Sequence, residues 1–276
     1  MNGGILMRTR VISGLAMVPL LLVVYFGGYW LIAATCIVSV IGIKEFFNGF
    51  RQMGIEPSLK LGYAAIALLY GLHCYMYYMG DFNNIFVLAW LVLVIMAGSL
   101  YMFDLEKRKP EDAMATMTGI IYVVFFAFHV VLVDEIDNFS IMKWLILLTA
   151  FGSDIFAYFS GMLFGRHKLC PELSPKKTIE GAVGGVLGSV LLSALFGFIF
   201  ARQYLIHFVI IGLLASPVSM LGDLTASAYK RKMGIKDYGD LIPGHGGIMD
   251  RFDSVLFTAP FVYYYVMIVM RYFMGL

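Results

Sequence analysis

The sequence predicts an all-α polytopic membrane protein with about nine transmembrane helices. Of its 276 residues, 61% are hydrophobic and only 14% are charged, whereas a soluble domain has about 25% charged residues. The mean hydropathy is +0.84. Apolar runs of the roughly 20 residues that a bilayer-spanning helix needs recur along the whole chain. The composition therefore argues against a folded water-soluble protein.

The predicted spans follow one another with short polar connections. Pro and Gly inside several runs are compatible with this prediction, because membrane helices tolerate them. Arg8 and Arg10 precede the first run and could mark a secretory signal, but no small-residue cleavage site follows, so we expect a retained first span. The nine segments are residues 11–27, 29–47, 61–79, 84–103, 114–133, 141–164, 181–201, 205–226 and 252–274.

The distribution of Lys and Arg predicts the orientation of these spans. With the N-terminus in the cytoplasm, 17 of the 20 Lys and Arg residues fall on the inner side, as the positive-inside rule requires. Nine spans then place the C-terminus outside. The inner loops 166–180 and 230–250 are the richest in Gly, Pro and charge, so we expect residues 141–276 to form the catalytic part. Residues 1–140 would form a scaffold for packing or dimerisation, within one integral membrane unit that has no separate soluble domain.

Polar residues cluster at the inner end of the eighth predicted span. Asp223, Ser227, Lys230 and Arg231 are spaced i, i+4, i+7 and i+8, which puts them on one face if the helix continues past the membrane. A solvated helix end with snorkelling side chains would explain part of the basic charge. It does not explain a carboxylate beside an apolar stretch, where an unpaired charge is costly. We therefore predict a functional role for Asp223.

A glycine-rich turn, Leu241–Gly247, precedes the ninth predicted span. Its glycines allow close approach to a ligand, and its N–H groups, with the following helix N-terminus, can bind an anion. Asp250 and Asp253 are three residues apart and can face one ion. Helix-dipole complementarity would explain either residue alone. Together with Asp223 they predict a Mg²⁺ or Mn²⁺ site, with a second cation left open. The substrate-binding residues predicted here are His245, Gly246, Gly247 and Arg251, although His245 alone could simply brace the turn.

A second basic loop precedes the seventh predicted span. Ser174 and Pro175 suit the N-cap and first position of a helix. Lys176 and Lys177 would then stand at the helix start, where the dipole favours acids, so they are predicted to serve an incoming polyphosphate. Ordinary positive-inside charge is the alternative explanation.

Three other features were assigned more modest roles. The glycines between Gly181 and Gly188 lack the GxxxxGK[ST] pattern and predict close helix packing rather than a phosphate loop. Asp154, inside the sixth span, is predicted as a second-tier site residue that relays an ion or proton or is paired within a polar cavity. The segment Asp104–Asp112 alternates in sign and predicts a solvated loop.

These motifs closely resemble those of the phosphatidate cytidylyltransferase, or CDP-diacylglycerol synthase, family. The segments Ser174–Gly181 and Gly222–Leu224 are similar to that family as well. The family's signature positions are occupied here by Ser227, Lys230, Arg231, Lys236, Asp237, Gly239, Ile242, Pro243, His245, Gly246, Gly247, Asp250, Arg251 and Asp253.

The resemblance implies a reaction of CTP with phosphatidic acid that gives CDP-diacylglycerol and pyrophosphate, for phospholipid biosynthesis, with a divalent cation. It also implies a polar cavity opening to the cytoplasm and the lipid, in the plasma or inner membrane. A homodimer is expected from the same resemblance, and no nucleic-acid partner is expected. Asp223, Asp250 and Asp253 would hold the cation. Lys176, Lys177, Lys230, Arg231 and Arg251 would steady the triphosphate.

Two alternatives remain open at this point. One is a cytidylyltransferase for another lipid phosphate, such as an archaeal isoprenoid ether, which the signature does not distinguish. The other is an ion or solute transporter in which Asp154 and the broken helices act as gates. Transporter folds are often built from internal repeats, and the sequence shows no such repeat.

Overall fold

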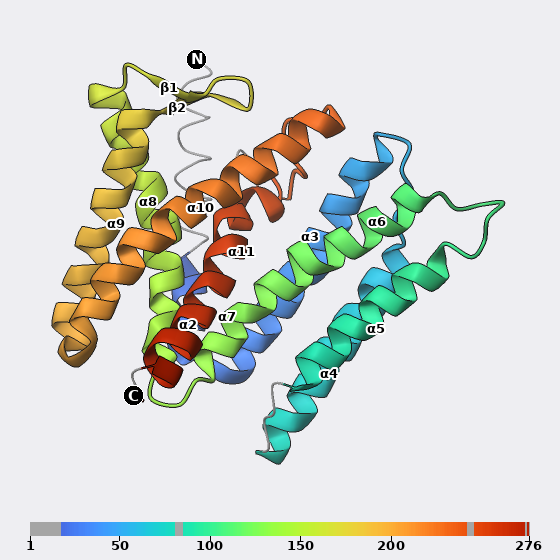
Figure 1. The fold of residues 1–276 in the computed structure, drawn as a ribbon, viewed down its shortest axis with the longest axis horizontal. Helices are drawn as coiled ribbons and strands as arrows, with labels where there is room; N and C mark the ends of the chain where they lie inside the picture. The colour runs from blue at the N-terminus through green and yellow to red at the C-terminus, as the bar shows by residue number, and fades with distance from the viewer. Residues whose placement is uncertain (1–17, 81–84, 242–245, 274, 276) are drawn as a thin grey trace. The chain divides into compact units, whose positions relative to one another are not determined.

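The computed structural model describes residues 18–80, 85–241, 246–273 and 275, and these are almost entirely helical (Figure 1). The chain divides into two compact units. The first unit contains Met1–Phe128 and Lys232–Arg251, and the second contains His129–Arg231 and Phe252–Leu276.

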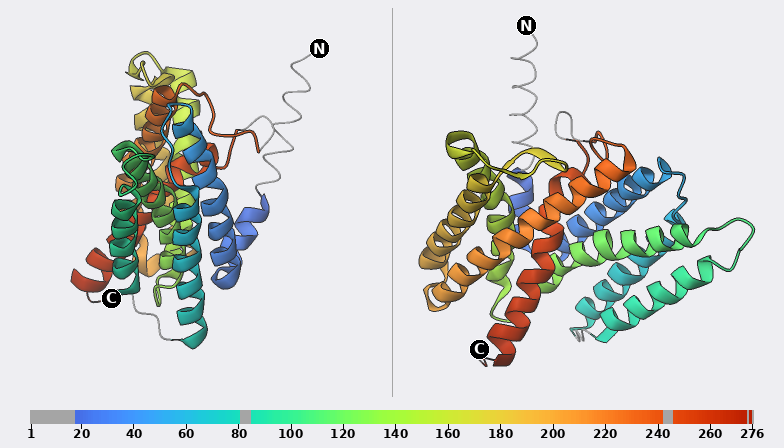
Figure 2. Two further views of the ribbon diagram at one scale, coloured as in Figure 1. Left: turned by 90° about the vertical axis from the view of Figure 1, so that its right-hand side faces the viewer. Right: turned by 45° about the horizontal axis from the view of Figure 1, so that its top comes forward.

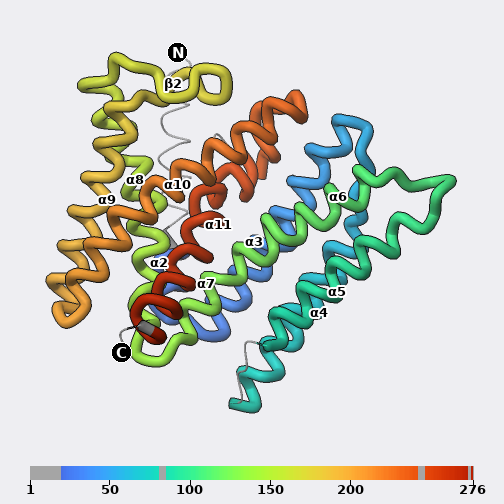
Figure 3. Tube along the Cα trace, in the orientation of Figure 1, coloured from blue at the N-terminus to red at the C-terminus, as the bar shows by residue number. Residues whose placement is uncertain are grey.

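The first unit is an assembly of apolar helices joined by short turns. Ser58 begins one of them, because its side chain accepts a hydrogen bond from the N–H of Leu61 at 3.3 Å. Helices α4 and α5 lie alongside each other (Figure 3). The elements are α2 (Val18–Phe26), α3 (Gly28–Arg51), α4 (Leu59–Met79), α5 (Ile85–Tyr101), α6 (Pro110–Gly119), the π-helical η1 (Ile120–Phe125) and the start of α7 (Phe126–Asp134).

The core of the first unit is built around α3. Phe46 and Phe47 are completely buried. A Cβ at Gly119 of α6 would collide with the Phe47 ring, and one at Gly62 of α4 would lie 2.7 Å from Ile43 and 3.2 Å from that ring. Trp90 of α5 is 1% exposed, and its indole N–H donates to a backbone carbonyl of α4 at 2.9 Å. Small residues on one helix thus leave space for the large aromatic side chains of its neighbour, as is common where membrane helices pack closely.

The second unit contains the remaining helices and one short hairpin. Its elements are the rest of α7, the 3₁₀ turn η2 (Ser140–Met142), α8 (Lys143–Phe164), β1 (Lys168–Cys170), β2 (Ser174–Thr178), α9 (Ile179–Phe200), the 3₁₀ turn η3 (Arg202–Tyr204), α10 (Leu205–Met233) as far as Arg231, α11 (Met249–Tyr264) from Phe252 onward and the π-helical η4 (Tyr265–Phe273).

Helices α8 and α9 pack through small residues. A Cβ at Gly185 would lie 2.9 Å from the carbonyl oxygen of Ser153, and one at Gly188 would overlap the Phe156 ring. The predicted packing role of these glycines is confirmed. Buried hydroxyls then join both helices to α10, since Ser153 bonds Ser216 at 2.8 Å and Ser189 donates to the backbone of α10 at 3.0 Å.

Six described segments are long and apolar enough to cross a membrane: Gly28–Arg51, Pro110–Asp134, Ser140–Phe164, Ile179–Phe200, Arg202–Met233 and Met249–Tyr272. They agree with a polytopic membrane protein. Two further predicted spans fall on α4 and on the 17-residue α5. The tyrosines of α4 lower its hydropathy, and α5 is short for a span. Residues 11–17 of the first predicted span lie outside the described residues, and the rest of that span includes the nine-residue α2.

The start of α9 differs from the prediction. Ser174 and Pro175 belong to strand β2 rather than to a helix start. The helix begins at Ile179, where the Thr178 hydroxyl accepts the N–H of Gly181 at 3.1 Å as the N-cap. Lys176 and Lys177 are therefore strand residues. The pairing of β2 with β1 supplies backbone partners that a local helix-start rule does not consider.

The predicted solvated loop at Asp104–Asp112 is also partly wrong. Asp112 is 3% exposed. One carboxylate oxygen accepts the N–H of Lys109 at 2.9 Å, and the other accepts that of Glu56 at 2.7 Å. The side chain therefore caps the start of α6 and ties it to the loop after α3.

Candidate active site

A short hairpin lies between the end of α8 and the start of α9, visible from two further directions in Figure 2. Its strands pair antiparallel, with Lys168 opposite Thr178. Glu180 holds the base of the hairpin, because its carboxylate accepts the N–H groups of Arg166 and His167 at 3.1–3.3 Å. The His167 ring nitrogen Nδ1 lies 2.6 Å from the same carboxylate. These contacts fix the position of β2 and of the side chains that it carries.

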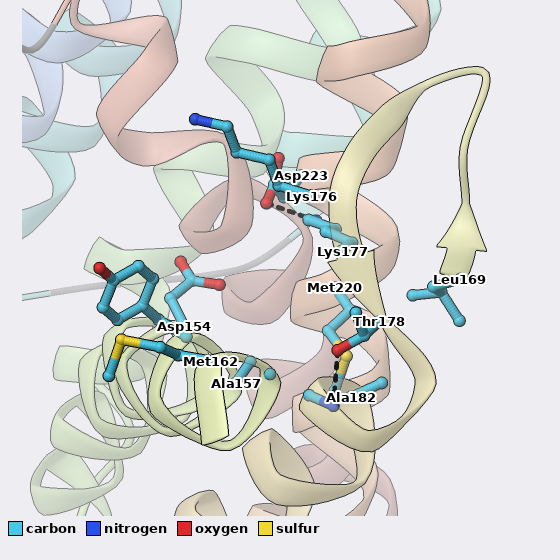
Figure 4. A pocket seen from close by; sticks show the side chains of 13 residues that line it. Asp154, Ala157, Met162, Leu169, Lys176, Lys177, Thr178, Ala182, Met220 and Asp223 are labelled. Carbon is cyan, nitrogen blue, oxygen red and sulfur yellow. Dashed lines mark hydrogen bonds and ion pairs between the residues drawn. The ribbon is translucent and has the colours of Figure 1, made fainter. Parts of the chain in front are cut away.

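Beside this hairpin lies a pocket of about 350 Å³, formed by α8, β1, β2, α9 and α10 (Figure 4). Met162, Leu169 and Met220 supply part of its apolar wall. Four charged residues predicted for the site also line it, namely Asp154, Lys176, Lys177 and Asp223. The structure therefore brings together the loop lysines and two of the predicted carboxylates. Figure 4 shows the Asp154 carboxylate pointing from α8 into this space.

The central contact of the pocket is an ion pair between β2 and α10. The Nζ atom of Lys177 lies 2.5 Å from Oδ2 of Asp223, and both side chains are about one quarter exposed. The ammonium N–H groups are not aligned with the carboxylate as in a regular hydrogen bond, so the contact is chiefly electrostatic. The Nζ atom itself is buried, but both side chains are only partly covered, so a ligand that offers either charge a better partner can open the pair.

The C-terminal end of α10 has the predicted form. The helix continues to Met233, and the Ser227 hydroxyl donates to Oδ1 of Asp223 at 3.4 Å, one turn away. The predicted common face of Asp223 and Ser227 is confirmed. Further along, Lys230 is half-buried and Arg231 is exposed.

Asp253 of α11 belongs to the same neighbourhood. Its side chain is 8% exposed, and the negative charges of Asp223 and Asp154 and the positive charge of Lys230 act on it. The helices α10 and α11 approach closely here, since a Cβ at Gly222 would lie 2.7 Å from the Asp253 carbonyl oxygen. Two of the three predicted metal ligands therefore face one region of the second unit.

The third predicted ligand, Asp250, lies in the first turn of α11, directly after the polar loop of residues 234–248, and belongs to the first unit. Its Oδ2 accepts the N–H groups of Tyr238 at 2.7 Å and Gly247 at 3.0 Å. Gly246 has a φ of +82°, as the glycine-rich turn predicts. The Nε atom of Arg251 is buried and has no hydrogen-bond partner among the residues that the structure describes. His245 lies outside the described residues.

The donor set suits a hard divalent cation, because Mg²⁺ takes carboxylate oxygens and leaves positions for phosphate and water. Across residues 18–80, 85–241, 246–273 and 275, no group of three or more His, Cys, Asp or Glu side chains is gathered closely enough to hold a metal. The argument that the site suits a divalent cation therefore rests on the two carboxylates of Asp223 and Asp253. Asp253 is nearly buried, and a buried carboxylate needs a positive partner to offset its charge.

One residue of this region was missed by the sequence analysis. Glu45 of α3 is 8% exposed, and its carboxylate accepts the N–H groups of Ile248 and Met249 at the start of α11. The signal was present, because Glu45 is the only acidic residue in the predicted span 29–47. An ionisable residue inside a span indicates a specific partner.

Comparison with known proteins gives one consistent result. A sequence model of the cytidylyltransferase family matches residues 8–269. The chain is 34% identical to the phosphatidate cytidylyltransferase of Synechocystis sp., over 95% of this chain and 97% of that protein. It is 30% identical to the phosphatidate cytidylyltransferase of Staphylococcus haemolyticus, over 91% and 94%, and 28% identical to that of Mycobacterium bovis, over 92% and 86%. This chain belongs to the cytidylyltransferase family.

Proposed function

We propose that the protein transfers the cytidylyl group of CTP to phosphatidic acid, giving CDP-diacylglycerol and pyrophosphate. Relatives that align over nearly the whole chain are named phosphatidate cytidylyltransferases. The observation that carries the proposal is the pocket itself, where Lys176, Lys177, Asp154 and Asp223 are gathered on otherwise apolar walls. Such a pocket suits a substrate with an anionic head and an apolar body.

The chemistry requires positioning more than proton transfer. A lipid phosphate is already an anionic nucleophile, and its oxygen forms a bond to the α-phosphorus of CTP while the bond to the β-phosphate oxygen breaks and pyrophosphate leaves. The main obstacle is repulsion between two polyanions, which fixed positive charges reduce. Lys176 and Lys177 lie on β2 at the pocket and would neutralise phosphate oxygens. Lys230 and Arg251 are the further residues proposed to contact phosphate.

Asp223 and Asp253 would hold the divalent cation, with Asp250 as the third predicted ligand. A bound Mg²⁺ or Mn²⁺, alone or with a second cation, supplies charge neutralisation at the transferring phosphoryl group. Lys177 pairs with Asp223 in this structure. When a cation and CTP are present, the ammonium would turn from Asp223 to the triphosphate.

The proposed setting is the plasma or inner membrane, with nine spans, the N-terminus in the cytoplasm and the C-terminus outside. The pocket would then open toward the cytoplasm, where CTP is found, while phosphatidic acid enters from the bilayer. The Lys and Arg distribution supports this orientation. A homodimer is proposed from the resemblance to the family.

The test is a substrate screen with the purified full-length protein in lipid nanodiscs. We expect pyrophosphate release from CTP only when phosphatidic acid and Mg²⁺ are both present, and a lipid product with the mass of CDP-diacylglycerol. An isoprenoid ether lipid phosphate serves as the competing substrate. Faster turnover of the ether lipid would assign the protein to the other lipid class. No pyrophosphate with any lipid phosphate would favour the transporter alternative.

A further inference from the structure

The beginning of α11 lacks a local cap. The first N–H groups of a helix have no partner inside it and are usually satisfied by a Ser, Thr, Asp or Asn at the N-cap. The residue before Met249 is Ile248, whose side chain has no acceptor. The first turn of α11 carries Asp250 and Arg251, which are part of the family signature. The contacts that fix this turn therefore determine where these two predicted site residues lie.

Glu45 of α3 supplies the missing cap from about 200 residues earlier in the chain. Its Oε1 accepts the N–H of Ile248 at 3.1 Å, and its Oε2 accepts that of Met249 at 2.9 Å. Both oxygens of one carboxylate are therefore engaged by consecutive backbone donors. A negative charge at a helix N-terminus is also favoured by the helix dipole. Since the side chain is 8% exposed, little water competes for these bonds.

The loop is shaped to admit this carboxylate. A Cβ at Gly239 would lie 2.6 Å from Oε1 of Glu45, and one at Gly247 would overlap the same carboxylate. Two glycines of the signature-like loop thus keep space open for a side chain from another helix. Without Glu45, these glycines would surround unpaired backbone donors.

The face of α3 around Glu45 is matched to the loop. Gly42 lies three residues before it and Gly49 four residues after it, on the same side of the helix. A Cβ at Gly42 would meet the sulfur of Met249 at 3.3 Å, and one at Gly49 would meet that of Met233 at 2.5 Å. Small residues on either side of the acid let both ends of the polar loop rest on α3.

Asp250 completes the arrangement from the first turn of α11. Its Oδ2 accepts the N–H groups of Tyr238 and Gly247, while Glu45 accepts those of Ile248 and Met249. The two carboxylates together therefore accept four backbone N–H groups, two each, at the end of the loop and the start of α11. Removing Glu45 would leave two of these donors without partners and free the first turn of α11.

We propose that Glu45 is a positioning residue of the cytidylyl transfer site. It fixes the start of α11, and with it the place from which Asp250 and Arg251 project. Because the role is defined relative to lipid cytidylyl transfer, it rests on the proposed function. Glu45 does not itself touch substrate in this role, so its loss should lower turnover more than it weakens CTP binding.

The experiment compares Glu45→Gln and Glu45→Asp with the wild type and with Glu56→Gln as a matched control. Gln has nearly the same size but brings an NH₂ group against a backbone donor. Asp keeps the charge on a shorter side chain. Glu56→Gln makes the same chemical change at an exposed position, where the Glu56 carboxylate lies 3.5 Å from the Arg51 guanidinium.

Two readouts are measured on each full-length protein in nanodiscs. Hydrogen exchange of peptides covering residues 246–252 should be roughly tenfold faster in Glu45→Gln, as expected when a charge-assisted hydrogen bond is lost. The kcat should fall about 10- to 100-fold, since small displacements of reacting groups have effects of that order, while KM for CTP changes less than about threefold. Glu45→Asp should recover part of both, and Glu56→Gln should match the wild type.

Unchanged exchange at residues 246–252 in Glu45→Gln would overturn the proposal, whatever the activity. Faster exchange with an unchanged kcat would overturn it too, because Glu45 would then be a structural cap alone. If Glu45→Gln does not fold, Glu45→Asp gives the same two readouts. A wild type without transferase activity would instead refute the proposed function, and the exchange data would still report whether Glu45 holds the start of α11.

Discussion

The pocket beside the hairpin and the polar loop on α3 hold their acidic side chains in different ways. In the pocket, Asp223 is about one quarter exposed and its partners are a lysine side chain at 2.5 Å and a hydroxyl at 3.4 Å. At the loop, Glu45 of α3 and Asp250 of α11 are at most 9% exposed and accept N–H groups of the loop backbone and the start of α11 at 2.7–3.1 Å. Side-chain partners can move away when a ligand arrives, whereas backbone partners cannot.

The difference separates two tasks of acidic side chains. Carboxylates that accept backbone N–H groups fix the path of the chain. When such a carboxylate is lost, the site residues carried by that segment are displaced. A carboxylate paired with a flexible ammonium remains available to a cation. This distinction predicts different kinetic signatures for the two regions.

The largest effect is expected for Asp223→Asn. The change removes the charge that pairs with Lys177 and that would hold the cation, while the shape of the side chain is kept. We expect kcat/KM to fall by on the order of 10³-fold, the scale of lost charge stabilisation in phosphoryl transfer. Pyrophosphate release is the measurement, with Asp104→Asn in an exposed loop as the control. Activity within about tenfold of the wild type would remove Asp223 from the cation site.

Lys177→Met is expected to act mainly on CTP binding. The side chain lies at the pocket on β2 and would transfer its charge from Asp223 to the triphosphate. Losing one charge-assisted contact of this kind should raise KM for CTP about 10- to 100-fold. Lys168→Met, an exposed change on the neighbouring strand β1, is the control. Equal effects from both variants would make Lys177 ordinary loop charge. Lys176→Ala should also raise KM for CTP.

A smaller effect is expected for Ser227→Ala. Its hydroxyl donates to Asp223 at 3.4 Å, a long hydrogen bond whose loss should reduce kcat/KM about fivefold, equivalent to about 1 kcal/mol. The apparent Mg²⁺ requirement, measured by titration, should rise by a similar factor, because the hydroxyl orients the carboxylate. A loss as large as that of Asp223→Asn would instead indicate that Ser227 itself contacts a substrate.

The smallest effect is expected for Thr178→Val, which tests the support of the hairpin. The variant keeps the shape but removes the oxygen that accepts the N–H of Gly181 at 3.1 Å. Loss of an N-cap reduces stability by about 1 kcal/mol, so Tm in detergent should fall by about 3 °C. Thr225→Val is the control, since its hydroxyl bonds only within its own helix. An unchanged Tm would show that the pairing of β1 with β2 is sufficient.

Local periodicity explains what could be predicted from the sequence. Asp223 and Ser227 share a face because an α-helix repeats every 3.6 residues, and the structure confirms this face. The glycines of α9 were assigned to packing because small residues at such spacing bring helices together. The apolar runs that predicted the spans depend only on composition and length.

The features that could not be predicted depend on distant partners. Ser174 and Pro175 carry a local helix-start pattern, but β2 is stabilised by pairing with β1. Asp112 is buried because it accepts an N–H from Glu56, 56 residues earlier. The partners of Glu45 are more than 200 residues away. No local rule identifies such contacts, although an acid within an apolar span marks where one should be sought.

The most direct test of the account is an experimental structure with CTP and Mn²⁺, in which anomalous scattering locates the ion. We expect an ion whose ligands include carboxylate oxygens of Asp223 and Asp253, with the Lys177 ammonium turned to a CTP phosphate. An ion bound away from both carboxylates, with Lys177 still paired to Asp223, would contradict it.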